Sequence, residues 1–182
     1  MDSDLQFWLM YVSFIQRQLK DVSLARAKFE MRKASVGAYR VGDLCELTIE
    51  NAMFEEEQGN LQKARSLYDT LVTEVAPGHI KSVLAFISFE RRQNNNEKVR
   101  DLFFKAFQNA ISRKDSRSIT FIGIQYSRFL AFKTNEVQRA CDILDQATSS
   151  VKDSKVLYLS YVNLLKHLEG LGILQQLEMQ QN

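Results

Sequence analysis

The residues with the greatest potential for chemistry are two histidines and two cysteines. His79 and His167 lie far apart in the sequence, and neither has a cysteine or a carboxylate at the spacing of a metal site. Cys45 and Cys141 belong to no CxxC pair and have no histidine at a recognisable spacing, so we interpret them as packing residues with reduced thiols. These residues predict no catalytic centre, no metal site and no cofactor.

An acidic run and two glycine segments are the other candidates for catalysis or ligand binding. The three glutamates at 55–57 could suggest acid–base chemistry, but consecutive residues point to different sides of a helix. We therefore interpret the run as a solvent-exposed surface. Gly123 is isolated within an expected helix, and Gly170-x-Gly172 lacks the other residues of a phosphate-binding loop. Neither pattern indicates an enzyme.

Charge is distributed along the chain in blocks, although the net charge is only +2. Basic residues dominate positions 17–40, acidic residues follow at 43–57, and basic residues return at 91–105 and 113–117. Surfaces of alternating sign favour protein partners with complementary potentials. Direct contact with RNA phosphates is an alternative, but no interleaving of aromatic and basic residues indicates a stacking platform. A solvated face without a partner is a second alternative. The candidate interaction surface consists of Arg26, Arg32, Lys33, Arg91, Arg92 and Arg100.

The elements that must position these residues are amphipathic helices. The chain has one proline and seven glycines, too few turn residues for a β-sandwich or barrel. The segment from Leu44 to Val72 predicts two helices joined by a tight turn at 58–60. One face of the second helix carries Leu61, Ala64, Leu67, Tyr68, Leu71 and Val72.

This helical hairpin recurs along the chain. An aromatic residue late in each first helix is followed, after 11, 10, 10 and 11 residues, by a small apolar residue in the second helix. The aromatic residues are Phe14, Phe54, Phe89 and Phe129, and the small residues are Ala25, Ala64, Val99 and Ala140. The predicted core of the repeats contains these eight residues together with Trp8, Phe29, Tyr68, Phe103 and Leu144.

The repeats predict an all-α fold. One hairpin cannot bury both of its apolar faces, so stacked copies should form an α-solenoid of antiparallel helical hairpins, wound as a right-handed superhelix. We expect a single array over residues 1–170, and a frayed or truncated tail at 171–182. The expected units span about 5–36, 43–75, 79–111 and 118–149, with a partial unit at 155–170.

The repeated motifs resemble the HAT (half-a-tetratricopeptide) repeat family. The resemblance rests on an aromatic–acidic pair late in the first helix, Phe54-Glu55 and Phe89-Glu90, and on Ala-Arg-x-x-Tyr/Phe in the second helix. In later units the Ala-Arg pair of the second motif is replaced by Val99-Arg100 and by Ala140-Cys141. Over about residues 5–170 the chain looks like a U1 snRNP-associated splicing factor of this family, in the segments FWLMYVSF, AMFEEEQGNLQKARSLYDTL, SFERRQNNNEKVRDLFFKAFQNA and KVLYLSYVNLL.

The resemblance implies a non-enzymatic scaffold in the nucleus that holds splicing-factor proteins in the U1 snRNP during 5′ splice-site recognition. It also implies pairing, as a homodimer or with a related HAT protein, where full C-terminal repeats are present. Direct RNA contact would be secondary, and no apolar stretch approaches the roughly 18 residues of a membrane span. Two alternatives are a HAT scaffold of another RNA-processing complex, in 3′-end cleavage or ribosomal RNA maturation, and an enzyme whose catalytic centre the residues do not reveal.

Overall fold

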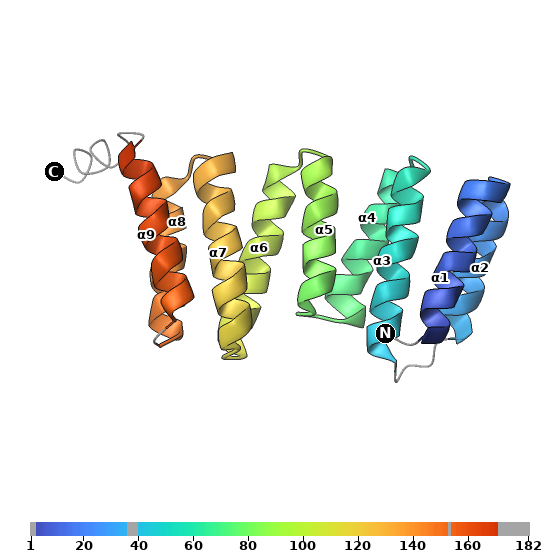
Figure 1. Cartoon of the computed structure of the whole chain (residues 1–182), viewed down its shortest axis with the longest axis horizontal. Helices are drawn as coiled ribbons and strands as arrows, with labels where there is room; N and C mark the ends of the chain where they lie inside the picture. Colours follow the sequence, from blue (N-terminus) through green and yellow to red (C-terminus); the bar gives the residue numbers. More distant parts are fainter. Residues whose placement is uncertain (1–2, 36–39, 153, 171–182) are drawn as a thin grey trace. The chain divides into compact units, whose positions relative to one another are not determined.

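The computed structural model describes residues 3–35, 40–152 and 154–170, and the regular structure in these ranges is entirely helical (Figure 1). The prediction of an all-α fold is therefore confirmed. Two α-helices continue into a π-helical turn, η1 (Ile15–Leu19) after α1 and η2 (Leu71–Val75) after α4. The α-helices are α1 (Ser3–Phe14), α2 (Val22–Ser35), α3 (Val41–Glu57), α4 (Leu61–Thr70), α5 (Ile80–Arg92), α6 (Asn96–Ser112), α7 (Ser116–Lys133), α8 (Val137–Ser150) and α9 (Lys155–Gly170).

The turns that lead into α2, α4, α6 and α8 share one backbone feature. Each contains a residue with a left-handed conformation, which glycine and asparagine adopt most readily. These residues are Lys20, Gly59, Asn94 and Asn135, with φ of 53°, 77°, 55° and 57°. Five residues after each of them lies the small apolar residue of the repeat, at Ala25, Ala64, Val99 and Ala140, and all four are fully buried. The four units therefore keep one register from turn to core.

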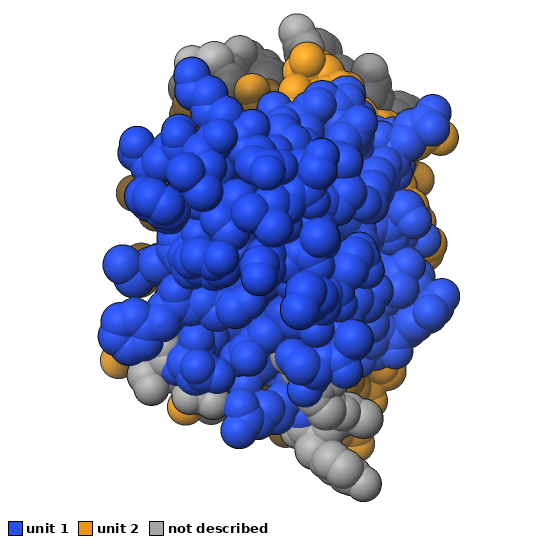
Figure 2. Space-filling view, turned by 90° about the vertical axis from the view of Figure 1, so that its right-hand side faces the viewer, with its two compact units in different colours: residues 1–88 blue, residues 89–182 orange. Residues whose placement is uncertain are grey.

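The described helices belong to two compact units, residues 1–88 and residues 89–182, and the division falls inside α5. Figure 2 colours the two units and shows the face of unit 1 on the side of α1 and α2. The core of unit 1 forms where α1, α2 and α3 meet. Its buried members are Val12, Ile15, Ala25, Phe29, Leu47 and Phe54, with Trp8, Leu9 and Val22 packed against them.

Aromatic contacts connect successive hairpins inside unit 1. The ring of Phe29 on α2 lies 5.3 Å from Trp8 on α1 and 5.5 Å from Phe54 on α3. Farther along, Tyr68 on α4 stacks on Phe86 on α5 at 5.5 Å. Such pairs add about 0.5–1.5 kcal/mol to the free energy gained from burial. The second helix of one hairpin thus packs on the first helix of the next.

Unit 2 repeats this packing around α7. Phe103 on α6 stacks on Tyr126 at 5.5 Å and lies 5.7 Å from Phe129, both on α7. On the same helix, Gly123 brings the backbone close to α6 and α8: a Cβ atom there would lie 3.3 Å from the ring of Phe107 and 3.2 Å from Ala147. A methyl group at this position would require Phe107 or Ala147 to move by a few tenths of an ångström.

The predicted core residues differ in their burial. Trp8 is half-buried against the core of unit 1. The prediction that Phe14 is a core residue is wrong, since its side chain is 53% exposed. Phe54 and Phe129 are buried because the second helix of the preceding hairpin covers them, whereas no hairpin precedes α1 among the described residues. The other predicted core residues, Ala25, Phe29, Phe54, Ala64, Tyr68, Phe89, Val99, Phe103, Phe129, Ala140 and Leu144, are buried.

The predicted unit boundaries can be compared with the observed bounds of the helices. The turn expected at 58–60 separates α3 from α4, and the helix expected from about residue 155 is α9. The single array over residues 1–170 stays a prediction, because the helices fall into two compact units. The tail expected to be frayed or truncated at 171–182 lies outside the described residues.

Candidate protein-interaction surface

The first residue of the candidate surface, Arg26, is engaged in the packing of two hairpins. From α2 its guanidinium donates two hydrogen bonds to Glu55 on α3, with Nε to Oε1 and Nη2 to Oε2 both at 2.8 Å. The guanidinium also lies 6.0 Å from the centre of the Phe54 ring. Both residues of the Phe54-Glu55 motif therefore contact Arg26. Because Arg26 binds inside its own unit, its main role is to join α2 to α3.

Glu55 is fully buried, which corrects the interpretation of the acidic run as solvent-exposed. Besides Arg26, its carboxylate binds Lys63 Nζ at 2.7 Å and accepts a hydrogen bond from Asn60 Nδ2 at 2.8 Å. Hydrogen bonding from Arg26, assisted by Lys63 and Asn60, outweighs the effect of burial and lowers the pKa of Glu55 to about 2. The charged form is strongly favoured. Glu55 is therefore a structural anion, held by charge-assisted hydrogen bonds.

The turn after α5 repeats part of this network. Glu90 is also fully buried, and its carboxylate accepts a hydrogen bond from Asn95 Nδ2 at 2.9 Å. The backbone N–H of Asn95 donates to the Glu90 carbonyl at 2.9 Å, as that of Asn60 does to the Glu55 carbonyl at 2.8 Å. The aromatic–acidic motif thus places a buried carboxylate where it binds the asparagine of the following turn. This explains why the acidic residue follows the core aromatic residue directly.

Two further residues of the candidate surface form ion pairs. Arg100 on α6 binds Glu136, just before α8, at 2.8 Å, and Glu136 also binds Arg139 at 2.6 Å. Arg32 on α2 binds Asp4 on α1 at 2.9 Å. Like Arg26, Arg100 follows the buried small residue of its helix and reaches a carboxylate of the next hairpin. The arginine of the repeat motif therefore acts within the fold at both positions.

The remaining three basic residues of the candidate surface are exposed. Lys33 lies near the end of α2 in unit 1, whereas Arg91 and Arg92 end α5 in unit 2. Within unit 1, Arg26, Arg32 and Lys33 all lie on α2, but Arg26 binds Glu55 on α3 and Arg32 binds Asp4 on α1. The exposed part of the candidate surface is thus smaller than the charge pattern predicts.

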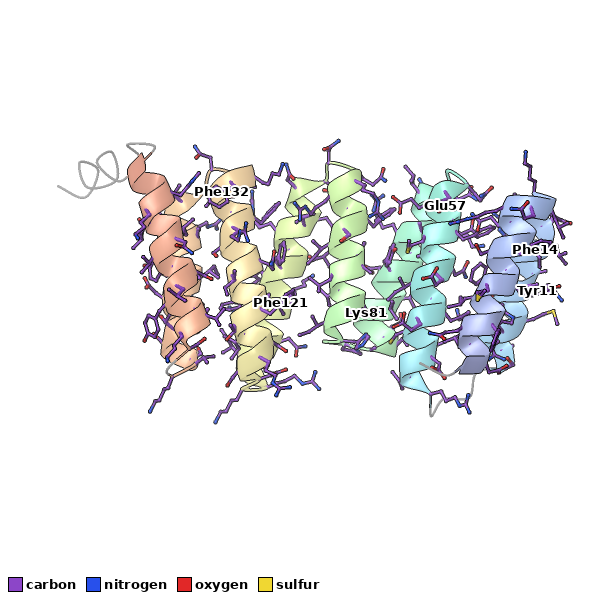
Figure 3. The ribbon with its side chains drawn as sticks, in the orientation of Figure 1. Tyr11, Phe14, Glu57, Lys81, Phe121 and Phe132 are labelled. Carbon is purple, nitrogen blue, oxygen red and sulfur yellow. The ribbon has the colours of Figure 1, made fainter. Side chains whose placement is uncertain are left out.

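Exposed aromatic side chains are a feature that the charge pattern did not predict. On α1, Phe7, Tyr11 and Phe14 are 71%, 47% and 53% exposed, and Figure 3 shows Tyr11 and Phe14 on the side of the helix away from α3. The ammonium group of Lys28 lies 5.7 Å from the centre of the Tyr11 ring. The sequence carries a signal for this, since apolar residues occur on every side of residues 7–15. A helix that is apolar all round requires a partner on each side.

A second exposed aromatic group lies on α7 in unit 2. Phe121 and Phe132, both labelled in Figure 3, are about half exposed. The Phe132 ring meets the ring of His167 on α9 edge to face, with 4.9 Å between the ring centres. His167 is thus a packing partner of an aromatic ring. His79, before α5, lies 2.8 Å from the hydroxyl group of Ser82 through its Nδ1 atom. Each histidine therefore has a local structural contact.

The described residues contain no group of three or more histidine, cysteine or acidic side chains that could hold a metal ion. Cys45 is buried and Cys141 half-buried, and both are free thiols. Burial raises the pKa of both thiols, which lowers the fraction of reactive thiolate at neutral pH. In the same part of the chain no helix combines the length and the apolar character needed to cross a membrane.

Comparison with known proteins places these features in a family. Residues 2–92, half of the chain, match the family described as the PRP39 C-terminal HAT repeat. The chain is similar to pre-mRNA-processing factor 39 of Homo sapiens, with 33% identity over 127 residues that cover 70% of this chain and 18% of the relative. It is 32% identical to pre-mRNA-processing factor 39 of Schizosaccharomyces pombe over 94 residues, 50% of this chain and 14% of the relative.

A plant relative matches over a longer part of the chain. Pre-mRNA-processing factor 39-2 of Arabidopsis thaliana is 26% identical over 166 residues, which cover 88% of this chain and 15% of the relative. The chain thus spans about a sixth of the length of these relatives. The match to the family covers α1 to α5, the helices that contain the aromatic–acidic pairs and the Arg26–Glu55 contact. On this evidence the chain belongs to the PRP39 C-terminal HAT repeat family of helical solenoid proteins.

Proposed function

We propose that this chain is a non-enzymatic scaffold of pre-mRNA splicing, which acts in the nucleus and holds protein partners in the U1 snRNP during 5′ splice-site recognition. The observation that carries the proposal is the match of its helical hairpins to a splicing-factor repeat family and to relatives named pre-mRNA-processing factor 39. A scaffold needs stable, extended surfaces rather than a reactive centre. Stacked hairpins supply such surfaces.

The chemistry of the described residues supports a binding role rather than catalysis. Glu55 and Glu136 bind arginines and so act in the packing of helices. Both cysteine thiols have raised pKa values, which is unfavourable for a nucleophile. Partners would meet the exposed basic residues Lys33, Arg91 and Arg92 through complementary acidic surfaces. Pairing with a second HAT protein and contact with RNA would add to this role.

Co-purification tests the proposal. The tagged full chain is incubated in a splicing-competent nuclear extract, recovered, and analysed for RNA and protein. Enrichment of U1 RNA and the U1 core proteins over a tag-only control is the expected result. Recovery of 3′-end cleavage factors or pre-ribosomal factors alone would overturn the proposal in favour of another RNA-processing complex.

Charge-reversal variants test the exposed basic residues separately. Lys33→Glu in unit 1 and Arg91→Glu in unit 2 should each lower recovery of the protein partners at least about threefold, because rim charges control encounter and specificity. The matched control is Lys152→Glu, which makes the same charge change at an exposed residue between α8 and α9. Unchanged recovery in both test variants would exclude these side chains from the interface.

A further inference from the structure

Three aromatic side chains form a stripe on the outer side of α1. Phe7, Tyr11 and Phe14 are separated by four and three residues, a spacing that places them on one face of a helix. All three are largely exposed, at 71%, 47% and 53%. We refer to these three residues as the α1 aromatic stripe. Large apolar side chains that gather on one exposed face indicate a surface for a partner.

The same three positions are buried in the other first helices. They are found by counting seven and three residues back from the aromatic residue that corresponds to Phe14. In α3 they are Leu47, Asn51 and Phe54, in α5 Ser82, Phe86 and Phe89, and in α7 Ile122, Tyr126 and Phe129, and none of these nine residues is more than 5% exposed. The exposure of the α1 aromatic stripe is therefore an exception to the repeat.

The structure also shows what covers these positions elsewhere. The cover is an aromatic ring on the second helix of the preceding hairpin, always four residues after the buried small residue. Phe29 covers Phe54, and Tyr68 covers Phe86, each at 5.5 Å between ring centres. Phe103 covers Tyr126 at 5.5 Å and Phe129 at 5.7 Å. One type of contact is thus repeated three times.

We propose that the α1 aromatic stripe is the docking surface for a HAT-type helical hairpin outside residues 1–182, whose second helix places an aromatic ring between Tyr11 and Phe14. The surface continues a series of interfaces already present in the chain. It differs from the basic surface discussed above, and it does not depend on the proposed role in splicing.

A second copy of this chain does not fit as the occupant. The rings that could serve, Phe29, Tyr68 and Phe103, are already buried under the following helix, and so is the equivalent residue of α8, Leu144. Among the described residues, a second copy therefore offers no second helix with an uncovered aromatic ring at the required position. A different hairpin must supply it.

Two residues beside the stripe define the chemistry of the partner. Ile15 follows Phe14 where Glu55 follows Phe54, so an arginine after the small residue of the partner would find no carboxylate there. Lys28 on α2 stands where Leu67, Leu102 and Ile143 stand in the other second helices, and its ammonium group lies over Tyr11. The partner hairpin should therefore combine an aromatic ring with an acidic side chain near Lys28, and lack the arginine of the repeat motif.

A chimera tests the proposal with the full chain. A second copy of residues 80–115, which contain α5 and α6, is joined directly before Met1, with Arg100→Met in the added copy alone so that this copy lacks the arginine of the repeat motif. In this design Phe14 lies 26 positions after the added Phe103, the same separation as that of Phe129 from Phe103. We expect the added hairpin to be helical by circular dichroism and the α1 amides to exchange hydrogen at least about tenfold more slowly than in the unextended chain.

Aspartate variants of the chimera and of the unextended chain serve as controls for the docking of the added hairpin. The chimera with Phe103→Asp in the added copy alone should lose the slower exchange, as should the chimera with Tyr11→Asp, while the unextended chain with Tyr11→Asp should keep its helical content. Unchanged exchange in α1 would overturn the proposal whether the added hairpin is helical or unfolded, since an available surface would dock and fold it. Light scattering of the unextended chain gives the last check. A dimer that Phe14→Asp converts to a monomer would assign the stripe to a second copy and overturn the proposal.

Discussion

Arg26 on α2 and Glu55 on α3 form a two-pronged ion pair that joins consecutive hairpins, and its two partners differ sharply in burial. The side chain of Arg26 is 36% exposed, whereas that of Glu55 is 0% exposed. When one partner is removed by substitution, the other keeps its burial: Arg26 stays partly exposed to water, and Glu55 stays buried. A guanidinium that already meets water can be hydrated, but a buried carboxylate cannot. The two halves of this pair should therefore respond differently to substitution.

Substitutions at the two positions test this asymmetry. We expect Arg26→Met to lower the free energy of unfolding by about 3 kcal/mol, because Glu55 stays buried with Lys63 and Asn60 alone. Glu55→Gln should lower it by about 2 kcal/mol, because Arg26 can turn toward solvent. Urea unfolding at pH 7, followed by circular dichroism, measures both values.

A surface pair provides the control for these variants. Lys105 and Asp101 lie 2.9 Å apart on α6 with both side chains exposed, so Lys105→Ala should change stability by less than about 0.5 kcal/mol. A larger loss for Glu55→Gln than for Arg26→Met would contradict the assigned burial of the pair.

The stability of the protein should also depend on pH through Glu55. Its pKa is about 2 in the folded chain and near 4.5 as an ordinary glutamate, so the folded state binds the proton more weakly than the unfolded state. The stabilisation is therefore complete above about pH 4.5 and is lost as the pH falls from there toward 2. With allowance for the partly exposed Arg26, it amounts to about 2 kcal/mol.

The comparison of the native chain with Glu55→Gln isolates this contribution. Because the amide side chain of that variant does not titrate, we expect the stability difference of about 2 kcal/mol at pH 7 to shrink toward zero as the pH approaches 2.5. Denaturant unfolding at intervals between pH 7 and pH 2.5 measures the difference in the free energy of unfolding between the two proteins. Parallel pH profiles for the two proteins would show that Glu55 does not titrate in this window.

The helices and turns could be predicted because their signals are local. Gly59 lies at a position with φ of 77°, and Asn94 and Asn135 occupy equivalent left-handed positions. The small residue five positions later starts an apolar face with a period of 3.6, which requires no knowledge of the rest of the chain. Both signals lie within a few residues of the element that they define.

The residues that were wrongly interpreted depend on a neighbouring hairpin. Glu55 belongs to an acidic run, and only Arg26, 29 residues earlier, explains its burial. Phe14 matches Phe54 and Phe129 in position, yet it is exposed because no hairpin precedes α1 among the described residues. The ion pair of Arg26, a candidate surface residue by its charge, likewise depends on the neighbouring hairpin. Burial at an interface between repeats cannot be obtained from the pattern of one repeat.

Gly123 should tolerate a methyl group poorly. In Gly123→Ala the new Cβ would lie 3.2 Å from the Cβ of Ala147 and 3.3 Å from the ring of Phe107, both fully buried. Alanine gains about 1 kcal/mol in helix propensity, but overpacking costs about 1–3 kcal/mol, so we expect a net loss of about 1 kcal/mol. Thermal unfolding measures the effect.

A glycine in an open position is the matched control. Gly42, in the first turn of α3, has no atom within 4 Å of the position of a Cβ, so Gly42→Ala should keep or raise the midpoint of unfolding. The double substitution Gly123→Ala with Ala147→Gly should cost less than the sum of the two single substitutions, since it removes the nearer contact. A rise in stability for Gly123→Ala alone would show that α7 can move away from α8.

Adjacent phenylalanines on α6 test the core that joins α6 to α7. Phe103 is 3% exposed and contacts the rings of Tyr126 and Phe129, whereas Phe104 is 49% exposed. Phe103→Ala leaves a cavity between two helices and should cost about 3–5 kcal/mol. Phe104→Ala removes the same atoms from a half-exposed site and should cost less than about 1 kcal/mol. Denaturant unfolding of the two variants, with the slope of the transition as a measure of cooperativity, provides the comparison. Because both changes delete one ring from the same helix, helix propensity changes equally in the two variants, and a larger loss for Phe103→Ala reports its buried contacts. Equal losses would contradict the packing of α6 on α7 through Phe103.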